Sequence, residues 1–90
     1  MGKSRKKVIR DELKAKLERA FRKQFPRDTV DISDGYQDLI HVLVVSRKFD
    51  GMGEKEKQQF LWRVIDKMNL AKDEEGLISL LLPVSPTEIK

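Results

Sequence analysis

The stretch IHVLVVSRKFDGMG, residues 40 to 53, decides the fold because its character changes halfway along. It begins with a nearly unbroken run of aliphatic and β-branched residues, which is typical of a buried strand. From Ser46 onward it becomes basic, and it carries Gly51 and Gly53 just before a helical pattern begins. The sequence therefore predicts a long apolar strand, residues 39 to 45, that ends in a glycine-containing corner.

Two further elements precede this strand. Apolar residues at spacings of three and four predict a helix over about residues 6 to 24, and Pro26 ends it. Residues 29 to 33 alternate apolar and polar as a half-buried strand should, and Asp34-Gly35 then favours a turn. The short loop between the two strands predicts that they pair antiparallel.

The chain after the corner returns to a helical period. We expect a second helix from Glu54 to about Leu70, and a polar break at residues 73 to 76. The apolar run from 77 to 82 predicts a third strand, and Pro83 and Pro86 are expected to end regular structure.

The order helix, strand, strand, helix, strand predicts an α+β fold. A third strand that follows a helix can pair parallel with the second strand through a crossover. Two helices with one apolar face each then cover a three-stranded mixed sheet, which makes a two-layer sandwich. We expect a single domain over residues 1–90, with a flexible basic tail at 1–5 and a C-terminal tail at 84–90.

Composition excludes several kinds of function. The 90 residues include no cysteine, which rules out disulfides, a thiol nucleophile and cysteine-bound metal from this chain. No apolar run is long enough for a membrane span, and the N-terminus lacks the apolar stretch of a secretory signal. There is no Ser–His–Asp pattern and no pair of carboxylates in an apolar setting. We expect a cytoplasmic, non-enzymatic protein without cofactor or metal.

Charge is unevenly distributed along the chain. The net charge is +4, but residues 1 to 27 hold eleven basic and three acidic residues, or +8. The remainder holds eight basic and twelve acidic residues, or −4. A basic helix of this kind attracts nucleic-acid phosphates or acidic partners. The alternative is a solvated helix face with a basic tail.

Three stretches of the chain match a known family. They are IRDELKAKL at 9–17 followed by Phe21, the pattern Ser46-x-x-Phe49-x-Gly51, and LISLLLPVSPTE at 77–88. In these stretches the chain resembles the BolA family. The resemblance implies a fold related to type II KH domains and a regulatory or adaptor role.

The same resemblance also shows where the chain departs from the family. Members usually carry a histidine in the last strand, and it helps bind a [2Fe–2S] cluster shared with a monothiol glutaredoxin; here Ile78 takes its place. An Arg-His pair early in the long helix is replaced by Lys57-Gln58. The one histidine, His41, is expected to be a solvent-side residue of its strand. A glutaredoxin-linked iron–sulfur role stays an alternative, as does an orphan structural or dimerising module.

The corner is the candidate nucleic-acid site. In KH-like folds, a glycine loop beside a helix start accepts a nucleic-acid backbone, and amides there favour anions. The KH signature separates its two glycines by two residues, whereas this chain separates them by one. The alternative is that Gly51 supports a tight turn and Phe49 fills the core. The candidate nucleic-acid-binding residues are Arg47, Lys48, Gly51, Gly53, Lys55, Lys14 and Arg22.

Trp62 is the candidate partner-binding residue. Its helical position points away from the apolar stripe that includes Val64, and its neighbours are polar. An exposed indole of this kind stacks on a base or anchors a protein partner. The alternative is that it packs against the C-terminal residues 83 to 89.

Overall fold

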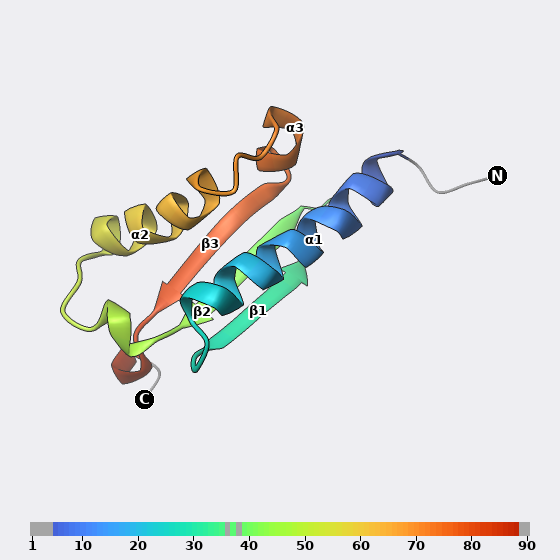
Figure 1. Ribbon diagram of the computed structural model, residues 1–90. Coiled ribbons are helices and arrows are strands. Elements are labelled where there is room, and N and C mark those ends of the chain that lie inside the picture. The colour runs from blue at the N-terminus through green and yellow to red at the C-terminus, as the bar shows by residue number, and fades with distance from the viewer. Residues whose placement is uncertain (1–4, 36, 38, 89–90) are drawn as a thin grey trace.

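The chain folds as the predicted α+β sandwich, in the order helix, strand, strand, helix, strand (Figure 1). The structure is a computed structural model, and it describes residues 5–35, 37 and 39–88. The elements are α1 Arg5–Gln24, β1 Thr29–Asp34, β2 Ile40–Val45, a one-turn 3-10 helix Arg47–Phe49, α2 Glu54–Asp66, α3 Lys72–Glu75, β3 Ile78–Val84 and a second 3-10 turn Pro86–Glu88.

The three strands form one mixed sheet in the order β1-β2-β3. β1 runs antiparallel to β2, with Thr29 opposite Val45 and Asp34 opposite Ile40. β3 runs parallel to β2. Both predicted pairings are therefore confirmed, and the helices lie over the sheet as a second layer (Figure 1).

The hydrophobic core lies between the sheet and the helices. The apolar stripe predicted for α1 is the buried one, and its Leu13, Leu17 and Phe21 are fully enclosed. From β2, the alternate residues Ile40, Val42 and Val44 face it. Full burial of such a side chain contributes roughly 1.5–3 kcal/mol, which makes this core the main source of stability.

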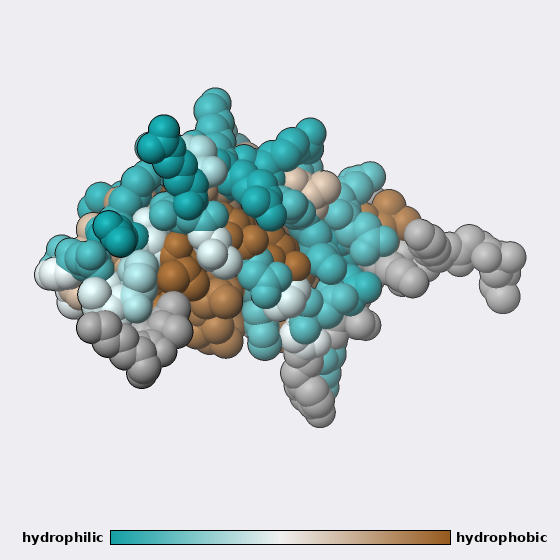
Figure 2. All heavy atoms as spheres, turned by 90° about the horizontal axis from the view of Figure 1, so that it is seen from below, coloured by the Kyte–Doolittle hydropathy of each residue, from teal (hydrophilic) through white to brown (hydrophobic). Residues whose placement is uncertain are grey.

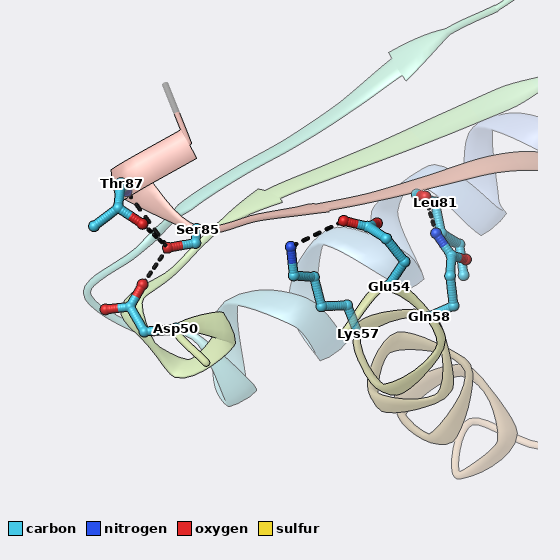
Figure 3. A network of polar contacts seen from close by, with 7 residues as sticks. All are labelled: Asp50, Glu54, Lys57, Gln58, Leu81, Ser85 and Thr87. Carbon is cyan, nitrogen blue, oxygen red and sulfur yellow. Dashed lines mark hydrogen bonds and ion pairs between the residues drawn. The ribbon is translucent and has the colours of Figure 1, made fainter. Parts of the chain in front are cut away.

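The end predicted for the last strand was wrong, because Pro83 lies inside β3. The carbonyl of Leu81 accepts a hydrogen bond from Gln58 Nε2 at 2.8 Å, so it points away from β2 (Figure 3). Pro83, two residues on, has the same backbone orientation. Since β3 is an edge strand, this position needs no N–H for pairing, and proline is tolerated there. Regular structure also resumes beyond it, in the turn Pro86–Glu88.

The second helix is shorter than predicted, and the polar break was also wrong. α2 ends at Asp66, and Asn69 shortly after it has a left-handed φ of 54° that no helix continues. The expected break at 73 to 76 overlaps the short helix α3. Its Glu74 accepts a hydrogen bond from the Ala71 amide and pairs with Lys16 of α1 at 2.9 Å. A tertiary ion pair thus supports a helix that its own sequence does not signal.

A register shift sets which side chains of β3 face the core. Between Ile40 and His41 the pairing skips Ser79, whose hydroxyl donates to the Ile40 carbonyl at 3.3 Å. After the shift Leu81 is buried, while Leu80 and Leu82 are 41% and 38% exposed. Figure 2 shows apolar side chains gathered on one face within a hydrophilic surround. Among the described residues, no helix has the length and hydropathy to cross a bilayer.

Candidate functional site

The candidate site is the glycine corner, defined here as residues 46 to 55 between β2 and the first turn of α2. Its first residue, Ser46, is buried, and its hydroxyl donates to Asp28 at 2.8 Å. The same oxygen accepts the amide of Lys48 at 3.1 Å, which caps the 3-10 turn. The hydroxyl of Ser46 therefore fixes the start of the corner by donating one hydrogen bond and accepting another.

Phe49 anchors the corner to the core. Its ring is fully buried, and its centroid lies 5.7 Å from that of Phe25 and 5.8 Å from that of Phe60. These separations fall in the range in which aromatic pairs attract beyond simple burial. The interpretation that Phe49 fills the core is confirmed, and the turn that follows it stands on a fixed base.

The two glycines of the corner have different backbones. Gly51 has a φ of +80°, which L side chains rarely adopt, and a Cβ there would meet nothing within 4 Å. Gly53 has an ordinary φ of −74° and is the N-cap of α2 without a side-chain cap. Both are exposed, so the backbone of the corner faces water.

The three cations of the corner are exposed but not equally available. Lys48 Nζ donates to the carbonyl of Gln24, the last residue of α1, at 2.6 Å. It also lies 4.8 Å from the centroid of the Phe25 ring. A cation at a helix C-terminus and over an aromatic face is stabilised by both, so Lys48 joins the corner to α1. Arg47 and Lys55 are the cations that face solvent without such a contact among the described residues.

Carboxylates share the corner with these cations. Asp50 accepts a hydrogen bond from the buried hydroxyl of Ser85, which also contacts Thr87 Oγ1 at 2.9 Å (Figure 3). Glu54 pairs with Lys57 at 3.2 Å. From 47 to 57 the chain has four basic and three acidic residues, a net charge of +1. The corner is therefore only weakly positive.

Lys57 is the polar residue that the sequence analysis did not recognise as buried. The residue is 3% exposed, and it lies on the same face of α2 as Leu61 and Val64. In Figure 3 it points toward Glu54. The spacing in the sequence indicates this burial, because Lys57 precedes Leu61 by four residues and Val64 by seven, which places all three on one face of a helix.

Two of the predicted nucleic-acid-binding residues, Lys14 and Arg22, lie on α1 and form ion pairs within the fold. Lys14 binds Asp34 at 3.0 Å, with Arg10 3.7 Å from the same carboxyl oxygen. The hydrogen bond from Lys14 holds the pKa of Asp34 below its usual value. Asp34 ends β1 at the opposite end of the sheet from the corner, so Lys14 does not belong to the corner. Arg22, in the last turn of α1, pairs with Glu18 at 3.0 Å.

Trp62 lies on the outer side of α2 and is 38% exposed. Leu61, Val64 and Ile65 of the same helix are buried, so the predicted direction of the indole is confirmed. It follows Glu54 by eight residues, or roughly 12 Å along the helix axis. The ring is thus a separate surface feature, two helical turns from the corner.

His41 is half-buried, and its neighbours Ile40 and Val42 face the core. Its imidazole lies against Gly35 so closely that a Cβ there would overlap it. Ile78, at the position of the family's ligand histidine, is 7% exposed within the core. Among the described residues, no group of three or more His, Cys, Asp or Glu side chains is arranged to hold a metal ion.

Comparison with known proteins finds a likeness of fold. No protein-family model matches the chain, and no curated protein matches it. The chain is similar in structure to a BolA-like hypothetical protein from Rickettsia prowazekii, solved by NMR, with a TM-score of 0.59. The match covers 94% of this chain and 97% of the other at 19% sequence identity. The predicted BolA-like fold is therefore confirmed over nearly the whole chain.

Proposed function

We propose that this chain is a non-enzymatic, BolA-like regulatory or adaptor protein that acts by binding a partner at the glycine corner. One observation carries the proposal: the exposed glycine backbone stands on a base fixed by buried Phe49 and Ser46. A preorganised surface of this kind loses little conformational freedom on binding. The shared fold supports a BolA-like role without identifying the partner.

Nucleic acid is the partner that the corner fits best. The open amides at the start of α2 suit phosphate oxygens, and Arg47 and Lys55 stand beside them. The Met52 amide after Gly51 already donates to the Phe49 carbonyl at 3.1 Å. Lys48 adds charge, although its amine already donates to Gln24. With a local net charge of only +1, we expect few phosphate contacts and modest affinity.

A titration at two salt concentrations tests this proposal. Fluorescence anisotropy of labelled single-stranded DNA, duplex DNA and RNA should show binding at low salt. With about two phosphate contacts, log K should fall with log salt at a slope of about −1.4 to −1.8. Arg47→Ala combined with Lys55→Ala should lower affinity by about tenfold or more.

Lys72→Ala is the matched control, because Lys72 is an exposed cation of α3, away from the corner (Figure 1). It should leave affinity nearly unchanged. Absence of binding to all three nucleic acids at low salt, or equal losses in both variants, would remove the nucleic-acid proposal.

The glutaredoxin-linked alternative gains no support from the residues at the family's ligand positions. Ile78 offers no donor atom and is buried, and Gln58, in place of the histidine of the pair, donates its Nε2 to the carbonyl of Leu81 at 2.8 Å. An alkyl side chain and a carboxamide replace the thiolate and imidazole ligands that hold iron–sulfur clusters. These residues do not fit the group, and we do not extend the proposal to it.

A further inference from the structure

A second surface lies between the C-terminal half of α1 and α2, and we call it the helix groove. It consists of two adjoining hollows with volumes of about 140 and 250 Å³. Its apolar lining is formed by Ala20 of α1, by Phe60 and Val64 of α2, and by Met68 in the turn after α2. Small-molecule sites usually exceed about 300 Å³, so each hollow suits a side chain of a partner better than a ligand.

The polar walls of the helix groove are cationic. Lys23 and Gln24 line it from α1, Arg63 lines it from α2, and Lys67 lines it as the C-cap of α2. All three cations are exposed, and among the described residues no carboxylate lines either hollow. An apolar floor between positive walls is complementary to a segment with apolar residues flanked by acids.

Three other cations of α1 already form ion pairs within the fold. Lys16 pairs with Glu74, Arg22 pairs with Glu18 and Lys14 pairs with Asp34. Within residues 5–35, 37 and 39–88 no carboxylate forms an ion pair with Lys23 or Lys67. Both amines face solvent, so an acidic partner can form ion pairs with them without breaking an ion pair of the fold.

We propose that the helix groove docks an acidic amphipathic helical segment of a partner protein. Its apolar side chains pack on Val64 and Met68, and its carboxylates pair with Lys23, Arg63 and Lys67. Ala20, Val64 and Met68 make most of the floor aliphatic, which favours apolar side chains over bases, and a nucleic acid is the competing occupant that the test separates. This proposal goes beyond the glycine corner and does not depend on it.

The test uses the ¹⁵N-labelled full chain and a synthetic amphipathic peptide of about 15 residues, with leucines on one face and glutamates on either side of them. Saturable NMR shifts are expected at amides of residues 20 to 24 and 63 to 68. A peptide with glutamine in place of each glutamate should bind about tenfold more weakly or worse. Arg63→Glu combined with Lys67→Glu should abolish the shifts while the spectrum of the fold is retained.

Lys72→Glu, an equal change of charge on α3, is the control and should keep peptide affinity within about threefold. Arg47→Ala with Lys55→Ala should also leave peptide binding intact, so failure here and failure of the nucleic-acid proposal are distinguishable. The proposal is overturned if the peptide gives no saturable shifts up to about 1 mM. Equal binding of the glutamine peptide, or larger shifts at the same amides with single-stranded DNA, would also contradict it.

Discussion

Single residues of the glycine corner show how backbone geometry and side-chain anchoring divide the work. Gly51 is required by its φ of +80°, while Gly53 has a φ of −74° that any residue adopts. Steric crowding does not require glycine at either position, because an added Cβ would meet no atom within 4 Å. The two residues look equivalent in the sequence, but only the first is constrained.

We expect Gly51→Ala to destabilise the protein by about 1–2 kcal/mol, because an L side chain in the left-handed region is strained. Gly53→Ala is the matched control. Its loss of N-cap preference is offset by lower entropy of the unfolded chain, so a change within about 0.5 kcal/mol is expected. Urea denaturation of both variants measures the difference, and equal stabilities would contradict the role given to Gly51.

Ser46 makes a second prediction at this scale. Its buried hydroxyl serves both Asp28 and the Lys48 amide, so Ser46→Ala leaves two groups without that partner. We expect a loss of about 1–2 kcal/mol in free energy of unfolding, and faster amide exchange at Lys48. Thr29→Ala, at an exposed strand position nearby, should cost much less. Unchanged exchange at Lys48 in Ser46→Ala would show that the cap is not formed.

Polar contacts along α1 join it to the other elements. Lys14 reaches Asp34 of β1, Lys16 reaches Glu74 of α3, and the carbonyl of Gln24 holds Lys48. The strongly basic α1 therefore has part of its charge committed to acids of the remaining chain. This pairing explains how a segment of +8 lies against one of −4 in a single fold.

These contacts predict a dependence of stability on pH. Hydrogen bonds from Lys14 and Lys16 lower the pKa of Asp34 and of Glu74 below their ordinary values of 3.8 and 4.5. The unfolded chain then binds more protons than the folded chain in acid. The stabilisation is present above about pH 4.5 and is lost as pH falls through the folded-state pKa values.

The urea concentration at the unfolding midpoint should thus be lower at about pH 3 than at about pH 6, because both carboxylates become protonated over this range. Asp34→Asn combined with Glu74→Gln should be less stable at about pH 6 and should show a flatter pH profile. Asp66→Asn, at an exposed position of α2 with no ion pair among the described residues, is the control. A double variant with the same acid slope as the parent would argue against these two pairs.

The whole molecule is held together where four phenylalanine rings meet. Phe25 stacks on Phe21 at 6.4 Å, and it lies 5.7 Å from both Phe49 and Phe60. The cluster joins the end of α1, the corner and α2 in one packed unit. The glycine corner and the helix groove therefore share a rigid support, since Phe60 belongs to both the cluster and the groove lining.

Phe49→Ala should cost about 3–5 kcal/mol, a large part of the 5–15 kcal/mol typical of a domain. Phe49→Leu should cost less because it leaves a smaller cavity, and it keeps the prediction measurable if the alanine variant unfolds. Arg47→Ala, two residues away and exposed, should stay within about 0.5 kcal/mol. Thermal and urea unfolding measure all three, and a small loss for Phe49→Ala would show that the ring is not part of the core.

Local pattern was enough for most of the architecture. The period of α1, the alternation in β1 and the apolar run of β2 each reflect which face of one element is buried, and that is written within a few residues. The same holds for the corner, where Ser46, Phe49 and Gly51 follow one another in the chain. The turn at Gly51 and the burial of Phe49 could be predicted from this local pattern, whereas the hydrogen bond of Ser46 to Asp28 joins residues far apart in the chain.

The remaining features depend on contacts between distant residues. Pro83 is tolerated within β3 because that strand lies at the sheet edge, and the skip at Ser79 decides which leucines are buried. Lys48 reaches Gln24, and α3 is supported by Lys16. The helix groove likewise exists only where α1 and α2 meet. The sequence by itself determined the main helices and strands and their buried faces. The tertiary structure alone decided the sheet edge, the register of β3 and the surfaces between helices, because these depend on contacts between residues far apart in the chain, which no local pattern encodes.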